Sequence, residues 1–278
     1  MRPALLLALV LSAPAAALEV RVDPAEAVPG DVLEASVLGA VEPRRVKLTY
    51  RGLEYALFPT PPDRLRAFIG LSAEAAAGTA PVRAVEPRRW RKDLAAEAVV
   101  TVASRTFTAR KLTMPPERAR LTSQPGAQDG AARIRAVAAV DTPVQRWEGP
   151  FRPPAEGRVS SAYGHPRTVN AQPWAWHKGV DIAAPVGSTV TAPNSGTVAL
   201  AGTYPIQGGT VVIDHGQGLM SALFHLGELL VKTGDEVAAS TPVARIGGSG
   251  FSTGAHVHWG VYVHGAAVDP APLTRRRL

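Results

Sequence analysis

Gly254-Ala255-His256-Val257-His258 leads into Trp259-Gly260-Val261-Tyr262-Val263, and this stretch does most to determine the fold of the last third of the chain. Four glycines between positions 247 and 254 predict a loop, and the apolar run after them predicts a strand. Because alternate residues of a strand point to the same face, we expect His256 and His258 to lie side by side at its start. The alternative is a flexible hairpin that carries two incidental histidines.

A second string, His177-Lys178-Gly179-Val180-Asp181, places an imidazole and a carboxylate four positions apart. Gly179 inside the string and Pro185 just after it argue against a helix, so we predict an extended segment. Taken alone, such a pair is most simply an ion pair at the surface. If it lies next to the first string in a sheet, the combined histidine and aspartate side chains suit a zinc ion with one open coordination position, as in hydrolytic sites.

His225 follows a predicted strand at 221–224, where a single histidine would ordinarily be a buried structural residue. Because His225 lies in the same predicted domain as the four other candidate side chains, it becomes a plausible fifth member of the site. A catalytic zinc usually takes three protein ligands and a water. Two histidines would then be left to act as general base and as stabiliser of the tetrahedral intermediate. The spacing does not decide which of His256 and His258 binds the metal.

The composition favours a β-rich globular protein of about two domains. The chain has 278 residues, is 46% hydrophobic and 19% charged, and contains 26 glycines and 25 prolines. It has no cysteine. The core must therefore hold the fold without disulfides, and any metal site must use histidine and carboxylate ligands.

The first residues have the pattern of a secretory signal. Arg2 gives a positive start, residues 4–11 are apolar, and Ala15-Ala16-Ala17 offers small residues for cleavage before Leu18. The alternative is a membrane anchor, but a spanning helix needs about 20 apolar residues and Glu19 arrives too early. We therefore expect a signal peptide at 1–17, no transmembrane segment after its removal, and export to the periplasm, the cell wall or the extracellular space.

The formal net charge is +7, and its excess is concentrated before residue 150. The densest run is Arg88-Arg89-Trp90-Arg91-Lys92. One interpretation is attraction to an anionic cell-envelope polymer or a membrane surface, and the other is an ordinary solvated face. A nucleic-acid partner is not expected, because an exported chain with no binding motif offers no support for one.

The sequence before residue 150 predicts an accessory domain followed by a connector. Residues 18–105 alternate apolar and polar positions between turn signals, which predicts about six or seven short strands in an Ig-like β-sandwich. Residues 106–150 are expected to form a connector broken by Pro115-Pro116 and Gly149-Pro150. Within it, Asp129 is expected to cap a helix that runs through Val140.

Residues 151–278 predict a second β domain, so the fold class as a whole is mainly all-β. The strand candidates in it are residues 196–201, 210–214, 221–224, 242–246 and 257–263. A weak repeat, Gly187-x-x-Val190-x-Ala192 and Gly234-x-x-Val237-x-Ala239, fits a sheet built from two similar halves. All seven histidines lie between residues 165 and 264, which points to chemistry in this domain.

Short motifs in this domain occur in the order of a known family. They are Val159-Ser160-Ser161-Ala162-Tyr163-Gly164, His177-Lys178-Gly179-Val180-Asp181-Ile182-Ala183-Ala184-Pro185, Val212-Ile213-Asp214-His215-Gly216, Phe224-His225-Leu226, Gly234-Asp235-x-Val237, Ser252-Thr253-Gly254-x-His256-Val257-His258 and Val268-Asp269-Pro270. This series resembles the lysostaphin-type (LytM-like) zinc metallopeptidases, which are peptidoglycan endopeptidases. The resemblance covers roughly 115 residues.

The resemblance implies a role for each candidate residue. His177, Asp181 and His258 would bind Zn²⁺, and His225 and His256 would be the catalytic pair. It also implies an antiparallel β-sheet groove of duplicated halves and hydrolysis of peptide bonds in the peptide part of peptidoglycan. The zinc would polarise the carbonyl and lower the pKa of its water.

The chain departs from the family in places, and its motifs leave other functions open. Ser240-Thr241 replaces the usual Gly-Gln, and Trp174 and Trp176 stand where the family often has a tyrosine near the substrate. Asn170 in the same loop could approach the metal in a latent form. A non-catalytic LytM-like activator of a cell-wall amidase typically loses zinc ligands, whereas this chain keeps them. A lipoyl or biotinyl carrier is another alternative. It would need a modifiable lysine at a hairpin tip between the two halves, and the sequence places no lysine there.

Overall fold

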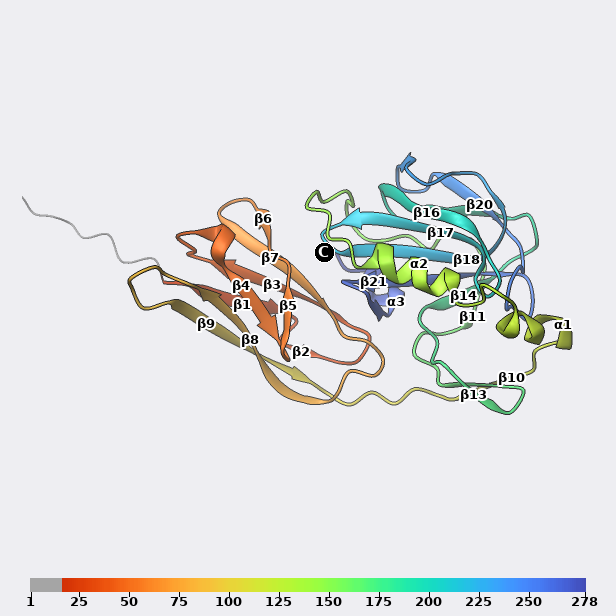
Figure 1. The fold of residues 1–278 in the computed structure, drawn as a ribbon, viewed down its shortest axis with the longest axis horizontal. Helices are drawn as coiled ribbons and strands as arrows, with labels where there is room; N and C mark the ends of the chain where they lie inside the picture. The colour runs from red at the N-terminus through yellow and green to blue at the C-terminus, as the bar shows by residue number, and fades with distance from the viewer. Residues whose placement is uncertain (1–16) are drawn as a thin grey trace, which may run out of the picture.

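The computed structural model describes residues 17–278. The expected signal peptide, residues 1–17, lies outside the described residues except for Ala17, and it stays a prediction. The described part is mostly β, as predicted, and consists of a sandwich followed by a larger sheet domain (Figure 1). None of its helices has the length and apolar character to cross a membrane.

The N-terminal part is a sandwich of two sheets with strand orders β1-β3-β7-β6 and β2-β9-β8-β4-β5. Its elements are β1 (Glu19–Asp23), β2 (Glu26–Ala27), β3 (Val32–Leu38), η1 (Pro43–Arg45), β4 (Lys47–Tyr50), β5 (Leu53–Tyr55), β6 (Phe58–Thr60), β7 (Arg64–Gly70), β8 (Gly78–Glu86) and β9 (Leu94–Val102). These nine strands of the described residues exceed the six or seven expected, because β2, β5 and β6 are too short to show an alternating pattern.

The alternation of side chains between the two faces of each strand explains the core of this sandwich. Leu33 and Ala35 of β3 and Ala67 and Ile69 of β7 point inward, and Val82 of β8 faces them from the other sheet. Each of these side chains is fully buried. The inner face of β9 is mostly alanine in its first half, which gives a weaker hydrophobic signal than valine or isoleucine.

The segment between the sandwich and the larger sheet carries short elements. β10 (Arg110–Leu112) pairs in parallel with β12 (Arg167–Val169), which pairs with β13 (Gln172–Trp174). Then come α1 (Pro116–Ala119), η2 (Arg120–Ser123) and α2 (Asp129–Ala138). The cap was predicted wrongly: Gln128 is the N-cap, and Asp129 is the first helical residue because its N–H bonds to Gly126 in the preceding turn (3.0 Å).

The second part is built on a sheet with the strand order β11-β14-β21-β18-β17-β16-β19, to which β15, β20 and β22 add. Its elements are β11 (Arg158–Ser161), β14 (Val180–Ala183), β15 (Thr189–Thr191), β16 (Gly196–Tyr204), β17 (Gly208–Gly216), β18 (Leu219–Leu229), β19 (Glu236–Val237), β20 (Pro242–Ile246), β21 (His256–Val263), β22 (Ala266–Val268) and α3 (Pro270–Leu273). All pairings in this sheet are antiparallel. Helix α2 packs on its outer face through Ile134 and Ala138.

The weak sequence repeat corresponds to two similar turns. Gly187 and Gly234 both have positive φ (85° and 96°), a conformation that glycine adopts without steric cost. Each is followed by a short strand, β15 or β19, whose valine is buried in the same core. The two halves therefore close over one hydrophobic core.

The sandwich packs against the end of β21 that is remote from His256 and His258. A side chain at Gly70 of β7 would meet Val263 and Val268 at 3.0–3.1 Å, so glycine permits this close approach. The guanidinium of Arg66 donates to Gln217 (2.6 Å) and Gln145 (2.7 Å) across the same boundary. The two parts therefore share one packed interface, which leaves the histidine end of β21 uncovered by the sandwich.

Candidate metal centre

Strands β14 and β21 bring the two sequence strings together. They are antiparallel neighbours, and their register places Asp181 directly opposite His258. Val180 and Ile182 alternate with Asp181 and point into the core, as Val257 and Trp259 do beside His258. The same alternation that buries the apolar side chains therefore turns both chemical groups to the other face.

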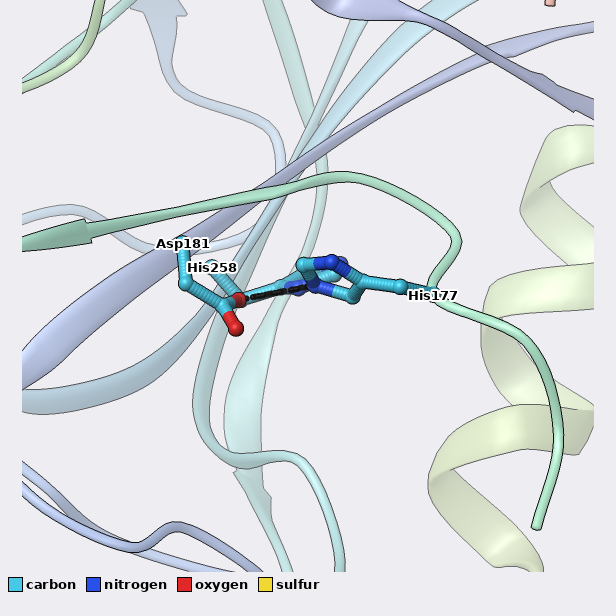
Figure 2. A group of neighbouring side chains, drawn as sticks. All are labelled: His177, Asp181 and His258. Carbon is cyan, nitrogen blue, oxygen red and sulfur yellow. Dashed lines mark hydrogen bonds and ion pairs between the residues drawn. The ribbon is translucent and has the colours of Figure 1, made fainter. Parts of the chain in front are cut away.

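Three side chains form a buried cluster on that face. Figure 2 shows His177, Asp181 and His258 converging, with His177 reaching in from the loop before β14. Oδ1 of Asp181 lies 2.9 Å from His177 Nε2 and 2.9 Å from His258 Nδ1, and these two nitrogens are 2.9 Å apart. One possible ligand atom from each residue lies within 4.8 Å of the other two, so this geometry can hold a metal ion.

Surrounding groups orient this cluster. Nδ1 of His177 donates to the carbonyl of Ala162 (2.7 Å), which leaves the lone pair of Nε2 directed at the cluster. The second carboxylate oxygen of Asp181 accepts a hydrogen bond from Arg167 Nη2 (2.9 Å). The ring of Phe224 stacks in parallel on His258 with centroids 5.1 Å apart. Each member of the cluster therefore has a partner that fixes its orientation.

His225 and His256 flank the cluster without joining it. Their ring centroids are 4.9 Å apart, and Nε2 of His256 lies 3.7 Å from Asp181 Oδ1. Nδ1 of His225 donates to Ser249 O, and Nδ1 of His256 donates to Gly254 O, each over 2.9 Å. Both rings therefore keep an unprotonated Nε2 when neutral.

His225 reaches this position through a β-bulge. The register between β17 and β18 shifts between Val211 and Gly209, so Phe224 and His225 occupy the place of one residue in the pairing. His225 has a φ of 62°, a left-handed conformation that is rare for residues other than glycine. A bulge of this kind re-aims a side chain next to a functional site.

Burial and neighbouring charges set the protonation of the cluster. Burial raises the pKa of Asp181, but its close polar contacts with His177 and His258 outweigh the effect of burial and hold that pKa well below its usual range. Burial lowers the pKa of His258 to about 4 and, with the help of His256, lowers the pKa of His225 to about 3. These imidazoles are therefore neutral near pH 7 and can donate a lone pair.

The structure brings all five predicted side chains together and keeps Asn170 apart. Asn170 Oδ1 accepts from the Met114 backbone N–H (2.9 Å) and its Nδ2 donates to Met114 O (3.1 Å), so its amide is engaged away from the cluster. Sequence reasoning missed Arg167. Its signal was weak, because a lone arginine in a loop-rich segment has no spacing that links it to Asp181.

Two cavities lie beside the cluster. The larger, about 460 Å³, runs between α2 and the sheet and is lined by His177, His258 and Tyr262. The smaller, about 180 Å³, is lined by Asp181, His256 and Met114. The rings of Trp174 and Phe251 border both cavities and are stacked 4.8 Å apart.

A buried group of two histidines and one aspartate, with two further imidazoles beside it, is a donor set of the kind that metallopeptidases use. Residues 175–270 match the model of Peptidase family M23. The predicted resemblance to lysostaphin-type enzymes is therefore confirmed for this part of the chain.

Two curated proteins are similar to part of this chain. The peptidoglycan DD-endopeptidase ShyA of Vibrio cholerae is 34% identical over 116 residues, which are 40% of this chain and 26% of ShyA. The DD-carboxypeptidase/endopeptidase Mpg of Neisseria meningitidis is 31% identical over 116 residues, which are 42% of this chain and 27% of Mpg. The chain thus spans about a quarter of the length of these curated relatives.

One solved structure resembles nearly the whole chain. A crystal structure of an M23-type protein from Pseudomonas aeruginosa superposes with a TM-score of 0.65 at 28% sequence identity. The match covers 89% of this chain and 94% of that one. The likeness therefore includes the sandwich as well as the metal-site domain.

Proposed function

We propose that the protein is an exported, zinc-dependent endopeptidase that hydrolyses peptide bonds in the peptide part of bacterial peptidoglycan. The observation that carries this proposal is the buried cluster of His177, Asp181 and His258 with two further imidazoles beside it. The Vibrio relative is named as a peptidoglycan DD-endopeptidase, which supports the substrate class, and the Neisseria relative is named as a DD-carboxypeptidase/endopeptidase. The secretory pattern of residues 1–17 supports export to the periplasm or the cell wall.

The donor set fits zinc. Two imidazole nitrogens and one carboxylate oxygen are ligands that zinc takes in catalytic sites, and the fourth position stays open for water or substrate. Tetrahedral ligands about 2.0–2.1 Å from zinc lie about 3.3 Å from one another, so the 2.9 Å contacts here need to open by only a few tenths of an ångström. A zinc ion bound there supplies a Lewis acid for the scissile carbonyl and lowers the pKa of a water.

The two flanking histidines suit proton transfer and charge stabilisation. Each has Nδ1 occupied by a backbone carbonyl, which fixes the ring and leaves Nε2 to accept a proton. After accepting it, the imidazolium can donate to the oxygen on which negative charge develops or to the leaving amine. We assign these roles to His225 and His256, while His177, Asp181 and His258 hold the metal.

The groove suits an extended peptide. Trp174 and Phe251 line both cavities, and each cavity is also lined by a member of the His-Asp-His cluster. Two aromatic faces beside the reacting centre can hold a peptide backbone in place, which is the positioning that accelerates hydrolysis.

Digestion of purified peptidoglycan tests this function. We expect the zinc-loaded protein to release peptide fragments whose masses identify the bond cleaved, and a chelator to stop the release. Asp181→Ala is the matched control and should release none. If the protein carries no metal and releases no fragment but stimulates a wall amidase, the amidase-activator alternative replaces this proposal.

A further inference from the structure

The hairpin tip between β8 and β9 exposes basic side chains and a tryptophan that the packing of the sandwich does not use. Trp90 at the tip is 90% exposed and has a φ of 67°. The guanidinium of Arg89 lies 5.6 Å from the centre of its ring. Asp93 Oδ1 accepts from the Arg88 backbone N–H (2.9 Å), which closes the loop and fixes the direction of the tip. The tryptophan is therefore held outward by its own turn.

A second basic loop lies beside this tip. The buried carboxylate of Glu86 accepts hydrogen bonds from the backbone N–H groups of Val41 (2.9 Å) and Glu42 (3.1 Å). This contact joins the loop that contains η1, with Arg44 and Arg45, to the end of β8. Val41 is 58% exposed on the same loop. We call the two loops, residues 41–45 and 88–93, the basic end of the sandwich.

Most charges of the basic end are not used within the fold. It carries six cations against Glu42, Asp93 and the adjoining Glu86, a formal excess of three. Arg45 pairs with Glu42, and Arg88 lies 3.9 Å from Glu86. The other four cations have no ion-pair partner within residues 17–278; they are Arg44, Arg89, Arg91 and Lys92.

The basic end lies away from the metal centre. In Figure 1 the β8–β9 hairpin turns at the far side of the sandwich, whereas β14 and β21 belong to the other part of the molecule. The chain also enters the sandwich at this end, because a side chain at Gly39 would collide with the backbone of Ala17. Contact at the basic end would therefore leave the groove open to a substrate on the opposite side.

We propose that the basic end docks the protein on an anionic lipid bilayer. Tryptophan favours the interface between headgroups and acyl chains, and each lysine or arginine near an anionic leaflet adds attraction. An anionic wall polymer would satisfy the cations equally well, but it offers no apolar layer for the exposed faces of Trp90 and Val41. The combination of an outward tryptophan with four unpaired cations therefore favours a bilayer. This inference does not depend on the proposed peptidase activity.

Vesicle binding of the full protein tests the proposal. We expect the wild type to sediment with vesicles that contain phosphatidylglycerol and not with pure phosphatidylcholine vesicles. Each basic residue near such a surface contributes about fivefold to partitioning, so Arg89→Gln/Arg91→Gln should weaken binding roughly 25-fold. The matched control is Arg275→Gln/Arg277→Gln, which removes the same charge from exposed residues outside the basic end and should change binding less than twofold.

Trp90 supplies a second readout. Its emission should shift to the blue on the anionic vesicles, and Trp90→Phe should remove that shift. Equal losses in the two double variants, or no binding of the wild type to anionic vesicles, would overturn the proposal. So would a result in which Arg89→Gln/Arg91→Gln weakens binding to purified peptidoglycan or its attached polymers but leaves vesicle binding unchanged.

Discussion

Arg167 illustrates how a residue outside the ligand set can position it. Its Nη2 donates to Asp181 Oδ2 (2.9 Å) and to Ser161 Oγ (3.0 Å), while Oδ1 of the same carboxylate faces the two histidines. The side chain is largely buried beside the aspartate. A hydrogen bond between charged groups in such a place fixes the carboxylate rotamer. Arg167 would therefore act on a bound metal through Asp181.

We predict that Arg167→Gln lowers metal affinity about tenfold to a hundredfold, the range found when a group that orients a ligand is lost. Competition with a chromogenic chelator measures this affinity. Arg110→Gln is the control, because Arg110 contacts His165 (3.1 Å) at the same rim and does not reach Asp181. Unchanged affinity in the Arg167 variant, with a folded protein, would contradict the positioning role.

Strand β17 carries a buried histidine with a purely structural environment. His215 is fully buried, and its two ring nitrogens bond Ser195 O and Ser221 Oγ, each over 2.8 Å. Burial lowers its pKa from 6.5 to about 4. The unfolded chain therefore binds a proton between these pH values that the folded chain does not bind.

The consequence is a loss of stability on the acid side. As pH falls from 6.5 towards about 4, His215 should reduce the free energy of unfolding by roughly 3 kcal/mol in total. Urea unfolding of the wild type and of His215→Gln at a series of pH values isolates this contribution. The other histidines are present in both proteins, so their contributions to the pH dependence cancel in the difference. The difference in stability between the two proteins should shrink by that amount. A difference that is constant over this range would refute the assignment.

Elements with a strong periodic pattern could be predicted from sequence. β20 was predicted at its observed bounds, and β21 began one residue earlier than expected. By contrast, β10, β12 and β13 have three residues each and are held by pairing with one another, so no local pattern reveals them. The bulge at His225 depends on a register shift between two strands, which the sequence of either strand alone does not encode.

The candidate site likewise contains residues that the sequence predicts and one that it does not. His177, Asp181, His225, His256 and His258 were found because their spacing and ordered motifs are local features of the sequence. Arg167 was not found, because its contact with Asp181 arises from tertiary folding. The assignment of His258 as a metal ligand and of His256 as a catalytic residue rests on the resemblance to the lysostaphin-type family. The structure places His258 in the cluster and His256 beside it, and the roles stay a proposal.

At the scale of the whole molecule, the two parts are joined by buried polar contacts as well as apolar packing. Arg66 of β7 is 4% exposed and donates to Gln217 of the second part and to Gln145 of the connecting segment. Its guanidinium also lies over the rings of Phe68 (4.8 Å) and Trp147 (5.3 Å). Removal of this side chain would leave the buried amide oxygen of Gln217 without this donor.

We predict that Arg66→Ala destabilises the protein by about 3 kcal/mol, because hydrogen bonds from a charged donor are lost and the acceptor of Gln217 stays buried. Urea unfolding should also separate into two transitions if the parts lose their coupling. Arg64→Ala is the control, since Arg64 bonds only within the sandwich and is partly exposed. Its expected cost is below about 1 kcal/mol. Equal costs for both variants would contradict the interface role.

The metal content of two single variants tests the central claim most directly. We predict about one zinc per chain in the wild type and in His256→Ala, a loss of zinc in His258→Ala, and a loss of peptidoglycan hydrolysis in both variants. This result would separate a metal ligand from a proton-transfer residue two positions away. Loss of zinc in His256→Ala with retention in His258→Ala, or a wild type that binds no zinc, would contradict the account.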